Sequence, residues 1–485
     1  MRKYIYILFI AVVMTGCGDF LEEESQSEVI PKTTSDFSEL LIGNGYPDGS
    51  GPNLGILYML DDDCEMDLVT RNWDGSDGIS GNTTTVRYSS YYQWQPTMCD
   101  VDGEGENWNT TISSTFYSYF YKKIMGCNAV LDLIDEALGT QEDRDRIKAE
   151  ALAVRSYLYF QLVNIFGEPY NYNKSALGVP LKLNSNLSDE SIPRATVQEV
   201  YENVIVPGLV EAARLLDPQP IMRKNYRINQ PAIHIILSRV YLFMERYEEC
   251  IAEANKAIAQ GAYLSNIITE GYASSSLDRF AYANPEVEWL TGSETYFNTV
   301  VNYYRPGMCS AFRALWDWDN DVRVDMFGLR LANSWDMIAK PSGSINLSQS
   351  IRGSEAYMNR MEAEALSGNS ASALNDLNLF RRNRIRNYVD ETLSGDALLT
   401  AIRTERRKEY CFEGFRWFDL RRYGMPEITH LYRAEAGGPL FKYTLKEKDP
   451  MYTIPFPSIL FEKNTALIQN ESRNGAARIG EIVNE

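Results

Sequence analysis

Residues 403–423 constrain the fold of this chain more than any other stretch of its sequence. Seven cationic and four anionic side chains lie between Arg403 and Arg422, together with several large aromatic residues. A solvent-exposed helix would not carry so many aromatic side chains. A buried helix could carry these charges only as ion pairs, because an unpaired buried charge is expensive. This charged segment therefore predicts a buried cluster of ion pairs, and Gly414 provides a break at which the chain can turn.

The pairing partners can be predicted from the shape of the arginine side chain. The planar guanidinium group suits forked hydrogen bonds to a carboxylate. The arginines expected to form such bonds are Arg406, Arg407 and Arg416. We expect their partners within the charged segment itself, at Glu409, Glu413 or Asp419.

The pattern E-x-x-F-E-G-x-R-W-x-D-L-x-R in this segment resembles the C-terminal signature of the SusD/RagB family of surface nutrient-binding lipoproteins. The signature residues are Glu409, Glu413, Gly414, Arg416, Trp417 and Asp419. Residues 149–169 and 454–470 also resemble family elements, with Thr465 where the family has proline. The resemblance covers nearly all of residues 17–485. It implies a binding protein of the outer membrane with a SusC-like, TonB-dependent transporter as its partner.

The N-terminus has the features of a lipoprotein signal peptide. Arg2 and Lys3 precede a short apolar run that ends at Met14, too short to span a bilayer. Met14 to Cys17 resemble a lipobox, so residues 1–16 are predicted to be removed and Cys17 to carry lipid. The acidic linker in residues 17–35 resembles an export tag. Together these features predict a lipid anchor in the outer membrane, with the protein facing the exterior.

Helical periodicity dominates the rest of the sequence. Residues 145–166, 231–260 and 354–381 place apolar side chains at helical spacing, and the last two contain a short turn between two helices. We therefore predict a mainly α fold, a tetratricopeptide-like superhelix of helix pairs with long irregular loops and a few short strands. It forms one domain from residue 36 to 485, with an N-terminal part (36–300) and a C-terminal part (301–485).

Composition and motifs exclude several classes of function. The chain has 47 basic and 66 acidic residues and a net charge of −19, so nucleic acid and anionic membrane surfaces are not expected partners. It lacks a nucleophile elbow, a P-loop and paired CxxC motifs. The two histidines, His234 and His430, have no partners at ligand spacing, and His234 fits a packing position in a helix. We expect no catalytic residues and no enzyme activity.

Aromatic residues in the long loops are the candidate binding residues. Exposed aromatic rings suit the apolar faces of sugar rings, and we expect loops from two distant parts of the sequence to form one platform. The candidates are Trp73, Tyr92, Trp94, Trp108, Tyr296, Tyr304, Arg305, Trp316 and Trp318.

Two acidic runs could bind Ca²⁺ through oxygen ligands. They are Asp61 to Asp67 and the alternating residues Asp317, Asp319 and Asp321. Neither has the complete EF-hand pattern, so no cofactor is expected.

The favoured reading of the sequence is a non-catalytic surface lipoprotein. It would capture oligosaccharides or polysaccharides and deliver them to the transporter. The alternative is a peptide-binding lipoprotein with the same partner, and a third reading is a surface glycoside hydrolase using two carboxylates.

Overall fold

The structure is a computed structural model, which describes residues 31–48, 54–67, 89–100, 108–187, 190–270, 282–291, 307–327, 349–434 and 438–484. The predicted signal peptide and Cys17 lie outside these ranges. The boundary predicted at residue 300 also falls outside them and stays a prediction.

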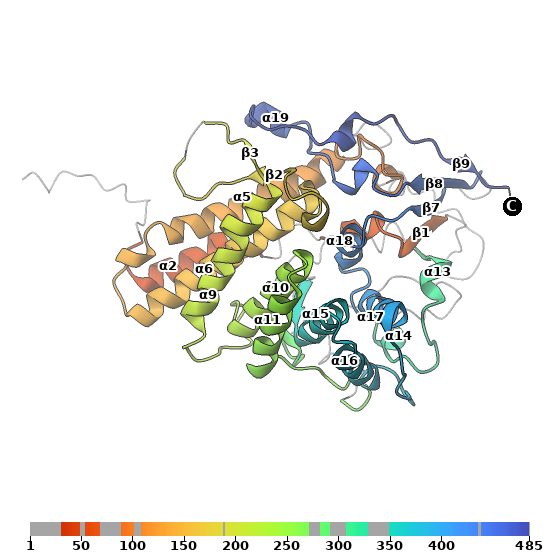
Figure 1. The fold of residues 1–485 in the computed structure, drawn as a ribbon. Helices are drawn as coiled ribbons and strands as arrows, with labels where there is room; N and C mark the ends of the chain where they lie inside the picture. The colour runs from red at the N-terminus through yellow and green to blue at the C-terminus, as the bar shows by residue number, and fades with distance from the viewer. Residues whose placement is uncertain are drawn as a thin grey trace, which may run out of the picture.

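The long helices form a continuous chain in which each helix packs on the one before it. They are α5 (Trp108–Leu131), α6 (Gln141–Phe166), α9 (Val206–Leu216), α10 (Gln230–Phe243), α11 (Tyr247–Ala259), α15 (Gly353–Leu366), α16 (Ser370–Arg382) and α17 (Gly395–Glu409). Figure 1 shows this series running from α5, α6 and α9 on the left to α15, α16 and α17 at the bottom. The predicted mainly α, tetratricopeptide-like fold is confirmed.

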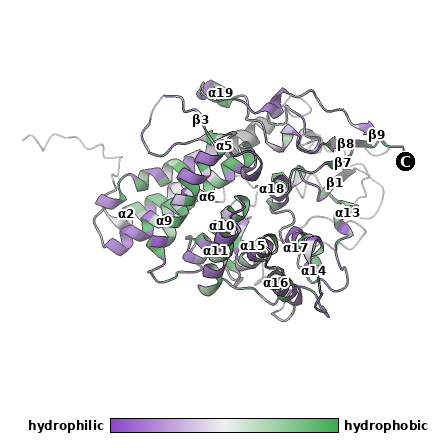
Figure 2. Cartoon of the chain, viewed as in Figure 1, coloured by the Kyte–Doolittle hydropathy of each residue, from purple (hydrophilic) through white to green (hydrophobic). Residues whose placement is uncertain are grey.

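Local sequence explains where these helices begin and how they pair. Thr140 and Asn229 cap α6 and α10 by accepting a hydrogen bond from a backbone N–H in the first turn. Ala254 and Ala257 of α11 are fully buried, which allows the neighbouring helices to approach closely. Gly368, with φ of +91°, makes the turn between α15 and α16. Figure 2 shows hydrophobic and hydrophilic residues on the same helices, as amphipathic packing requires.

Shorter helices join this series to the rest of the chain. They are α2 (Thr34–Leu40), η1 (Leu41–Gly45), η2 (Leu54–Met59), α4 (Ser89–Tyr92), η3 (Ile134–Glu136), α7 (Tyr170–Asn173), α8 (Val197–Val200), η4 (Tyr201–Ile205), α13 (Ser310–Arg313), α14 (Arg323–Met326), α18 (Phe415–Arg422), η6 (Pro450–Tyr452), α19 (Leu460–Lys463) and η7 (Glu471–Asn474). One hydrophobic core runs from Phe37 to Leu467, and a smaller one lies among α15, α16 and α17.

The strands are short, as predicted, and combine distant parts of the chain. The largest sheet has the order β5 (Gly307–Met308), β1 (Cys64–Asp67), β7 (Ile428–Arg433), β8 (Phe441–Leu445), β9 (Glu481–Ile482). Only the pairing of β1 with β7 is parallel among the described strands. Two further pairs are β2 (Leu177–Pro180) with β3 (Arg194–Thr196), and β4 (Val287–Thr291) with β6 (Gln349–Arg352).

The charged segment forms the predicted buried cluster of ion pairs. Gly414, with φ of +80°, separates α17 from α18 and lets the chain reverse. Arg406 pairs with Asp419 as expected, with a shortest N–O distance of 3.1 Å. Glu409 and Glu413 instead bind arginines from other elements. Burial opposes ionisation of Glu409, but the neighbouring guanidinium groups outweigh it and lower its pKa.

These arginines come from three separate elements, which the charged segment ties together. Arg323 of α14 lies 3.1 Å from Glu409, and Arg384, just beyond α16, lies 3.2 Å from the same carboxylate. Arg352 at the end of β6 lies 2.8 Å from Glu413. All three arginines are fully buried or nearly so.

The prediction for Arg407 and Arg416 is wrong. Both guanidinium groups turn away from their own segment to the loop before β1. Arg416 makes a forked pair with Asp62, at 2.7 and 2.9 Å. Arg407 donates to Asp63 at 2.5 Å and to the backbone carbonyl of Asp62 at 2.8 Å. Other arginines neutralise the carboxylates of the charged segment. The partners of Arg407 and Arg416 therefore lie more than 300 residues away in the sequence.

His234 is fully buried, as the sequence predicted, and holds three helices together. Its Nδ1 lies 2.5 Å from Glu253 of α11, and its Nε2 lies 3.0 Å from Asp217 at the end of α9. Burial opposes protonation of the imidazole, but the hydrogen bonds to the two carboxylates outweigh it and raise the pKa of His234 above 6.5. The imidazolium therefore acts as a cationic clamp between α9, α10 and α11.

Substitution Glu413→Ala should lower stability more than Arg416→Ala. The first leaves Arg352 buried without its carboxylate, a loss of about 3–5 kcal/mol in the free energy of unfolding. Substitution Arg416→Ala removes one of the two arginines that bind Asp62. Asp62 is about a quarter exposed and still has Arg407 at 3.3 Å, so the loss in the free energy of unfolding should be smaller. The stability losses of the two variants can be compared by their melting temperatures and soluble yields.

The matched control is Arg382→Ala, because Arg382 pairs with Asp390 at the surface, where such pairs contribute little. A Glu413→Ala protein that melts like the Arg382→Ala protein would contradict the buried-pair interpretation.

Stability should fall as the pH rises through the raised pKa of His234. A group whose folded pKa is raised stabilises the protein fully below its unfolded pKa, here 6.5, and loses this contribution above its folded pKa. Burial opposes ionisation of Asp217 and Glu253, but His234 outweighs it and lowers their pKa, so both stay charged in this window. Thermal melting from about pH 6 to about pH 9 should show the loss in the wild type and a flatter profile in His234→Gln. If the melting temperatures of the two proteins change with pH in the same way, His234 does not act as a cationic clamp.

Candidate ligand-binding site

Three rings that sequence analysis did not group lie stacked in the core beside the sheet. His430 of β7 lies between Tyr92 and Trp94, with ring centroids 4.0 Å and 3.9 Å away. Its Nδ1 is 2.7 Å from the carbonyl oxygen of Tyr92, and its Nε2 is 2.6 Å from that of Asp61. Burial lowers the pKa of His430 to about 4, although the two carbonyl oxygens that face its ring nitrogens favour the protonated form. The stack is structural, because no part of it faces solvent.

Tyr92 and Trp94 are therefore wrong as candidates for an exposed platform. Both side chains are fully buried. The Tyr92 hydroxyl donates to backbone carbonyls of Cys64 and Leu431, at 3.3 and 3.1 Å. The Trp94 indole N–H donates to the carbonyl of Leu60 at 3.0 Å. Periodicity and composition could not separate these rings from exposed ones, because their burial depends on strands that are far away in the sequence.

Trp316 is also wrong as a platform residue. Its side chain is 5% exposed and packs edge-on against Phe312 and Phe327. The buried cation Arg323 lies 5.7 Å from its ring centroid. Trp316 is thus part of the packing around the ion pairs, and a substitution there would disturb the fold first.

Trp318 is the described candidate that remains partly exposed. The guanidinium carbon of Arg313 lies 4.5 Å from its ring centroid, and the indole N–H donates to the Arg313 carbonyl at 3.2 Å. Arg313 holds the indole in place by a cation–π contact. The exposed residues Asp317 and Asp319 flank the ring in sequence. A fixed, half-buried indole beside charged and polar groups can stack on an apolar ligand face while its neighbours hydrogen-bond to hydroxyls.

The remaining candidates cannot be placed. Trp73, Tyr296, Tyr304 and Arg305 lie outside the described residues. Trp108 begins α5, but its side chain is also outside the description. They stay predictions.

Strand pairing places the strand ends that flank the long loops next to one another. In the β1–β5 pair, Glu65 is opposite Gly307, so the chain leaves β1 towards residue 68 next to where it enters β5 from residue 306. In the β4–β6 pair, Thr291 is opposite Gln349. The sequence predicted that one early and one later loop act together. The strand pairing places the described ends of these segments side by side. That the loops act together stays a prediction.

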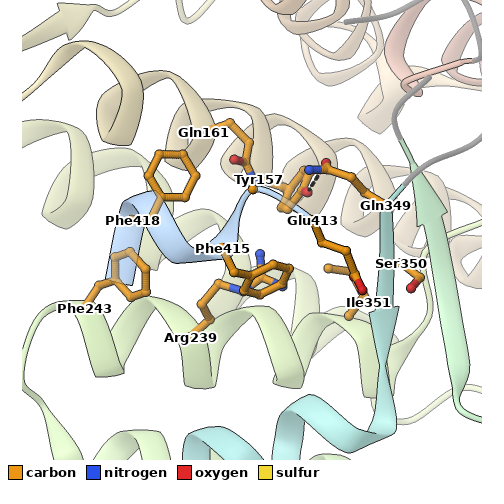
Figure 3. Close-up of a pocket in the computed structure, with 11 residues that line it drawn as sticks. Tyr157, Gln161, Arg239, Phe243, Gln349, Ser350, Ile351, Glu413, Phe415 and Phe418 are labelled. Atoms are coloured by element: carbon orange, nitrogen blue, oxygen red, sulfur yellow. Dashed lines mark hydrogen bonds between the residues drawn. The ribbon is translucent and has the colours of Figure 1, made fainter. Parts of the chain in front are cut away.

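A small cavity lies among the described residues. A cavity of about 20 Å³ lies where α6, α10, β6 and α18 meet, which is room for about one water molecule. Figure 3 shows the residues that line it, with Phe415 of α18 near the centre of the view next to Arg239 of α10. A sugar ring does not fit in this cavity.

The predicted Ca²⁺ ligands Asp317, Asp319 and Asp321 do not come together. Asp321 is buried and bonded to Arg323 and Lys408. Asp317 accepts hydrogen bonds from Asn320 and from the backbone of Asp319. Within the described residues, the acidic group close enough for a metal is Asp61, Asp62 and Asp63. Two arginines already bind Asp62 and Asp63, so these carboxylates serve as ion-pair partners.

No disulfide joins Cys64 and Cys99 in the described structure. The Cys64 thiol lies 3.3 Å from the carbonyl oxygen of Tyr58. The sequence did not single out Arg313, which ends the four-residue helix α13, a helix too short to give a periodic signal.

Comparison with known proteins gives matches over most of the chain. A family model described as "Starch-binding associating with outer membrane" matches residues 19–242. The model of the SusD family matches residues 329–473. A search of curated proteins found no match.

Solved structures of similar fold include proteins of Bacteroides. A SusD superfamily protein of Bacteroides thetaiotaomicron VPI-5482 is 22% identical, with a TM-score of 0.71 over 90% of this chain and 99% of that one. A SusD-like carbohydrate binding protein of Bacteroides vulgatus ATCC 8482 is 22% identical, with a TM-score of 0.62 over 90% and 97%. These likenesses show a shared fold. Together with the two family matches and the signature of α17 and α18, they show that this chain belongs to the SusD family.

Proposed function

We propose that this protein is a non-catalytic, cell-surface lipoprotein that captures glycans. It passes oligosaccharides or polysaccharides to a SusC-like, TonB-dependent transporter of the outer membrane. The observation that carries the proposal is the half-buried Trp318, stacked on Arg313 in a chain of the SusD family. Its loop follows α13, which begins directly after β5, so the indole belongs to the same region as the paired ends of β1 and β5.

The chemistry of the described residues supports binding rather than hydrolysis. Both histidines are buried, and each is held by fixed hydrogen bonds. Among the described residues, the closest group of carboxylates, Asp61 to Asp63, is mostly buried and bound to arginines. A glycosidase needs two carboxyl groups that reach the same glycosidic bond. Asp61 to Asp63 are not available for that role.

A lipid would anchor the protein in the outer membrane. Cys17 follows a short apolar run and an apparent lipobox, and the matching family model is described as associating with the outer membrane. None of the helices in the described part of the chain is long and apolar enough to cross a bilayer. The strongly acidic linker after Cys17 fits an export signal to the outer face.

Substitution Trp318→Ala should weaken glycan binding roughly tenfold, a loss of about 1.4 kcal/mol, because the stacking surface is removed. Shallow sites gain affinity from repeated contacts, so polymers should bind better than short oligosaccharides. An array of soluble polysaccharides, followed by calorimetry on the strongest ligand, measures the change.

Trp94→Ala is the matched control. It removes an indole from the core, so it should lower the melting temperature, which Trp318→Ala should leave close to wild type. If the Trp318→Ala protein binds the glycan with wild-type affinity, Trp318 is not part of the binding site. Binding to peptide digests but to no glycan would favour the peptide-binding alternative, and release of reducing sugar by purified protein would favour a hydrolase.

Substitution Cys17→Ala should abolish acylation and release the protein from the outer membrane. Metabolic labelling with a fatty-acid analogue and fractionation of cells measure both effects. Cys250→Ala serves as a control, because that thiol is buried in α11 and should not affect anchoring. A Cys17→Ala protein that stays in the outer membrane and is cleaved by external protease would exclude the lipid anchor.

A further inference from the structure

The turn that carries Trp318 is held in place by its own hydrogen bonds and by a neighbouring segment. One oxygen of Asp317 accepts the backbone N–H groups of Asp319 and Asn320, at 3.2 and 3.1 Å. The side-chain amide of Asn320 donates to the other oxygen of Asp317 at 3.0 Å. The carbonyl of Asn320 accepts the backbone N–H of Arg386 at 2.9 Å. The backbone of Asp319 therefore has a fixed position next to the indole.

Asp319 is exposed, and its carboxylate has no hydrogen bond or ion pair with any described residue. Asp317, on the other side of the ring in sequence, already uses both of its oxygens within the turn. A carboxylate can only accept hydrogen bonds. Asp319 therefore offers two free acceptor oxygens and a negative charge beside the candidate stacking surface of Trp318.

The nearest cation lies on the wrong side of the ring to attract an acidic sugar. The guanidinium carbon of Arg313 is 4.5 Å from the centroid of the Trp318 ring, so Arg313 covers one face of the indole. A sugar ring has to stack on the other face. At van der Waals contact it would be roughly 8 Å from the guanidinium group, which is about one Debye length at physiological ionic strength.

The balance of charge around the turn is negative. In the described part of the chain, exposed or half-buried charged side chains occur on the turn, on α13 and α14 beside it, and in residues 384–387. They are Asp317, Asp319, Asp325, Arg313 and Arg386. The carboxylates outnumber the guanidinium groups, and the chain as a whole carries a net charge of −19. Both the local and the overall charge repel an anionic ligand.

We propose that the Trp318 site selects uncharged glycans over glycans that carry carboxylate or sulfate groups, with Asp319 as the specificity-determining residue. This inference rests on the proposed function, because it concerns the glycan captured at Trp318. Sugar hydroxyls donate the hydrogen bonds that Asp319 accepts. A carboxylate or sulfate in the same place has no proton to donate and meets a like charge, so its binding is penalised twice.

Pairs of polysaccharides with the same backbone test the proposal. The uncharged members are dextran, pullulan, xyloglucan, galactomannan and arabinoxylan, and each is compared with its carboxymethylated derivative by calorimetry. EDTA is present throughout, so that no divalent cation bridges Asp319 and an acidic polymer. The wild type should bind the uncharged member about tenfold more tightly, and added salt should narrow this difference by screening the repulsion.

Substitution Asp319→Asn removes the charge and keeps an acceptor oxygen. It should raise affinity for the carboxymethylated polymer roughly fivefold and leave affinity for the uncharged polymer within about twofold, because the amide oxygen still accepts a hydroxyl. The matched control is Asp135→Asn, which changes the net charge by the same amount. Asp135 lies in η3 before α6, and Figure 1 shows α6 on the left and α13 on the right. This control should keep the wild-type selectivity.

The outcomes separate this inference from the proposed function. Equal or tighter binding of the carboxymethylated polymers by the wild type would overturn the inference and leave glycan capture intact. Selectivity that is unchanged in Asp319→Asn, or that shifts equally in Asp135→Asn, would overturn the role of Asp319. If the protein binds no polymer of either kind, the proposed function fails and the inference fails with it.

Discussion

The fold depends on the buried ion pairs between the charged segment and distant parts of the chain. Glu409 and Glu413 bind arginines that follow α16, begin α14 and end β6, while Arg407 and Arg416 reach back to the loop before β1. A buried charge is tolerated only with its partner in place. Each pair therefore fixes one element against α17 and α18, and the helix series and the sheet are held in one arrangement.

This arrangement also explains how a site can form on a scaffold of helix pairs. Helix pairs stack into an extended surface. The short strands bring residues 64–67, 307–308 and 428–433 together, so segments far apart in sequence begin side by side. Trp318 lies in a loop that follows these strands, fixed by Arg313. A packed helical scaffold that holds Trp318 in a loop fits a protein that binds ligands at its surface.

The burial of three aromatic residues could not be predicted from the sequence. Tyr92, Trp94 and Trp316 lie in polar stretches of sequence without helical periodicity, which is the context expected of exposed rings. The structure buries the first two against His430 and the third against Phe312 and Phe327. A local pattern cannot report this, because the covering groups come from other elements. The same limit applies to Asp62 and Asp63, whose arginine partners lie more than 300 residues away.

The sequence by itself determined the features that depend on neighbouring residues. Apolar periodicity and small residues predicted the helices around residues 145–166, 231–260 and 354–381, and the charges with Gly414 predicted a buried turn. Only the tertiary structure decided which carboxylate each arginine binds and that the ring of Trp318 stays partly exposed. Helical period and turn chemistry act over a few residues, whereas burial and ion pairing depend on segments that meet only in the folded chain.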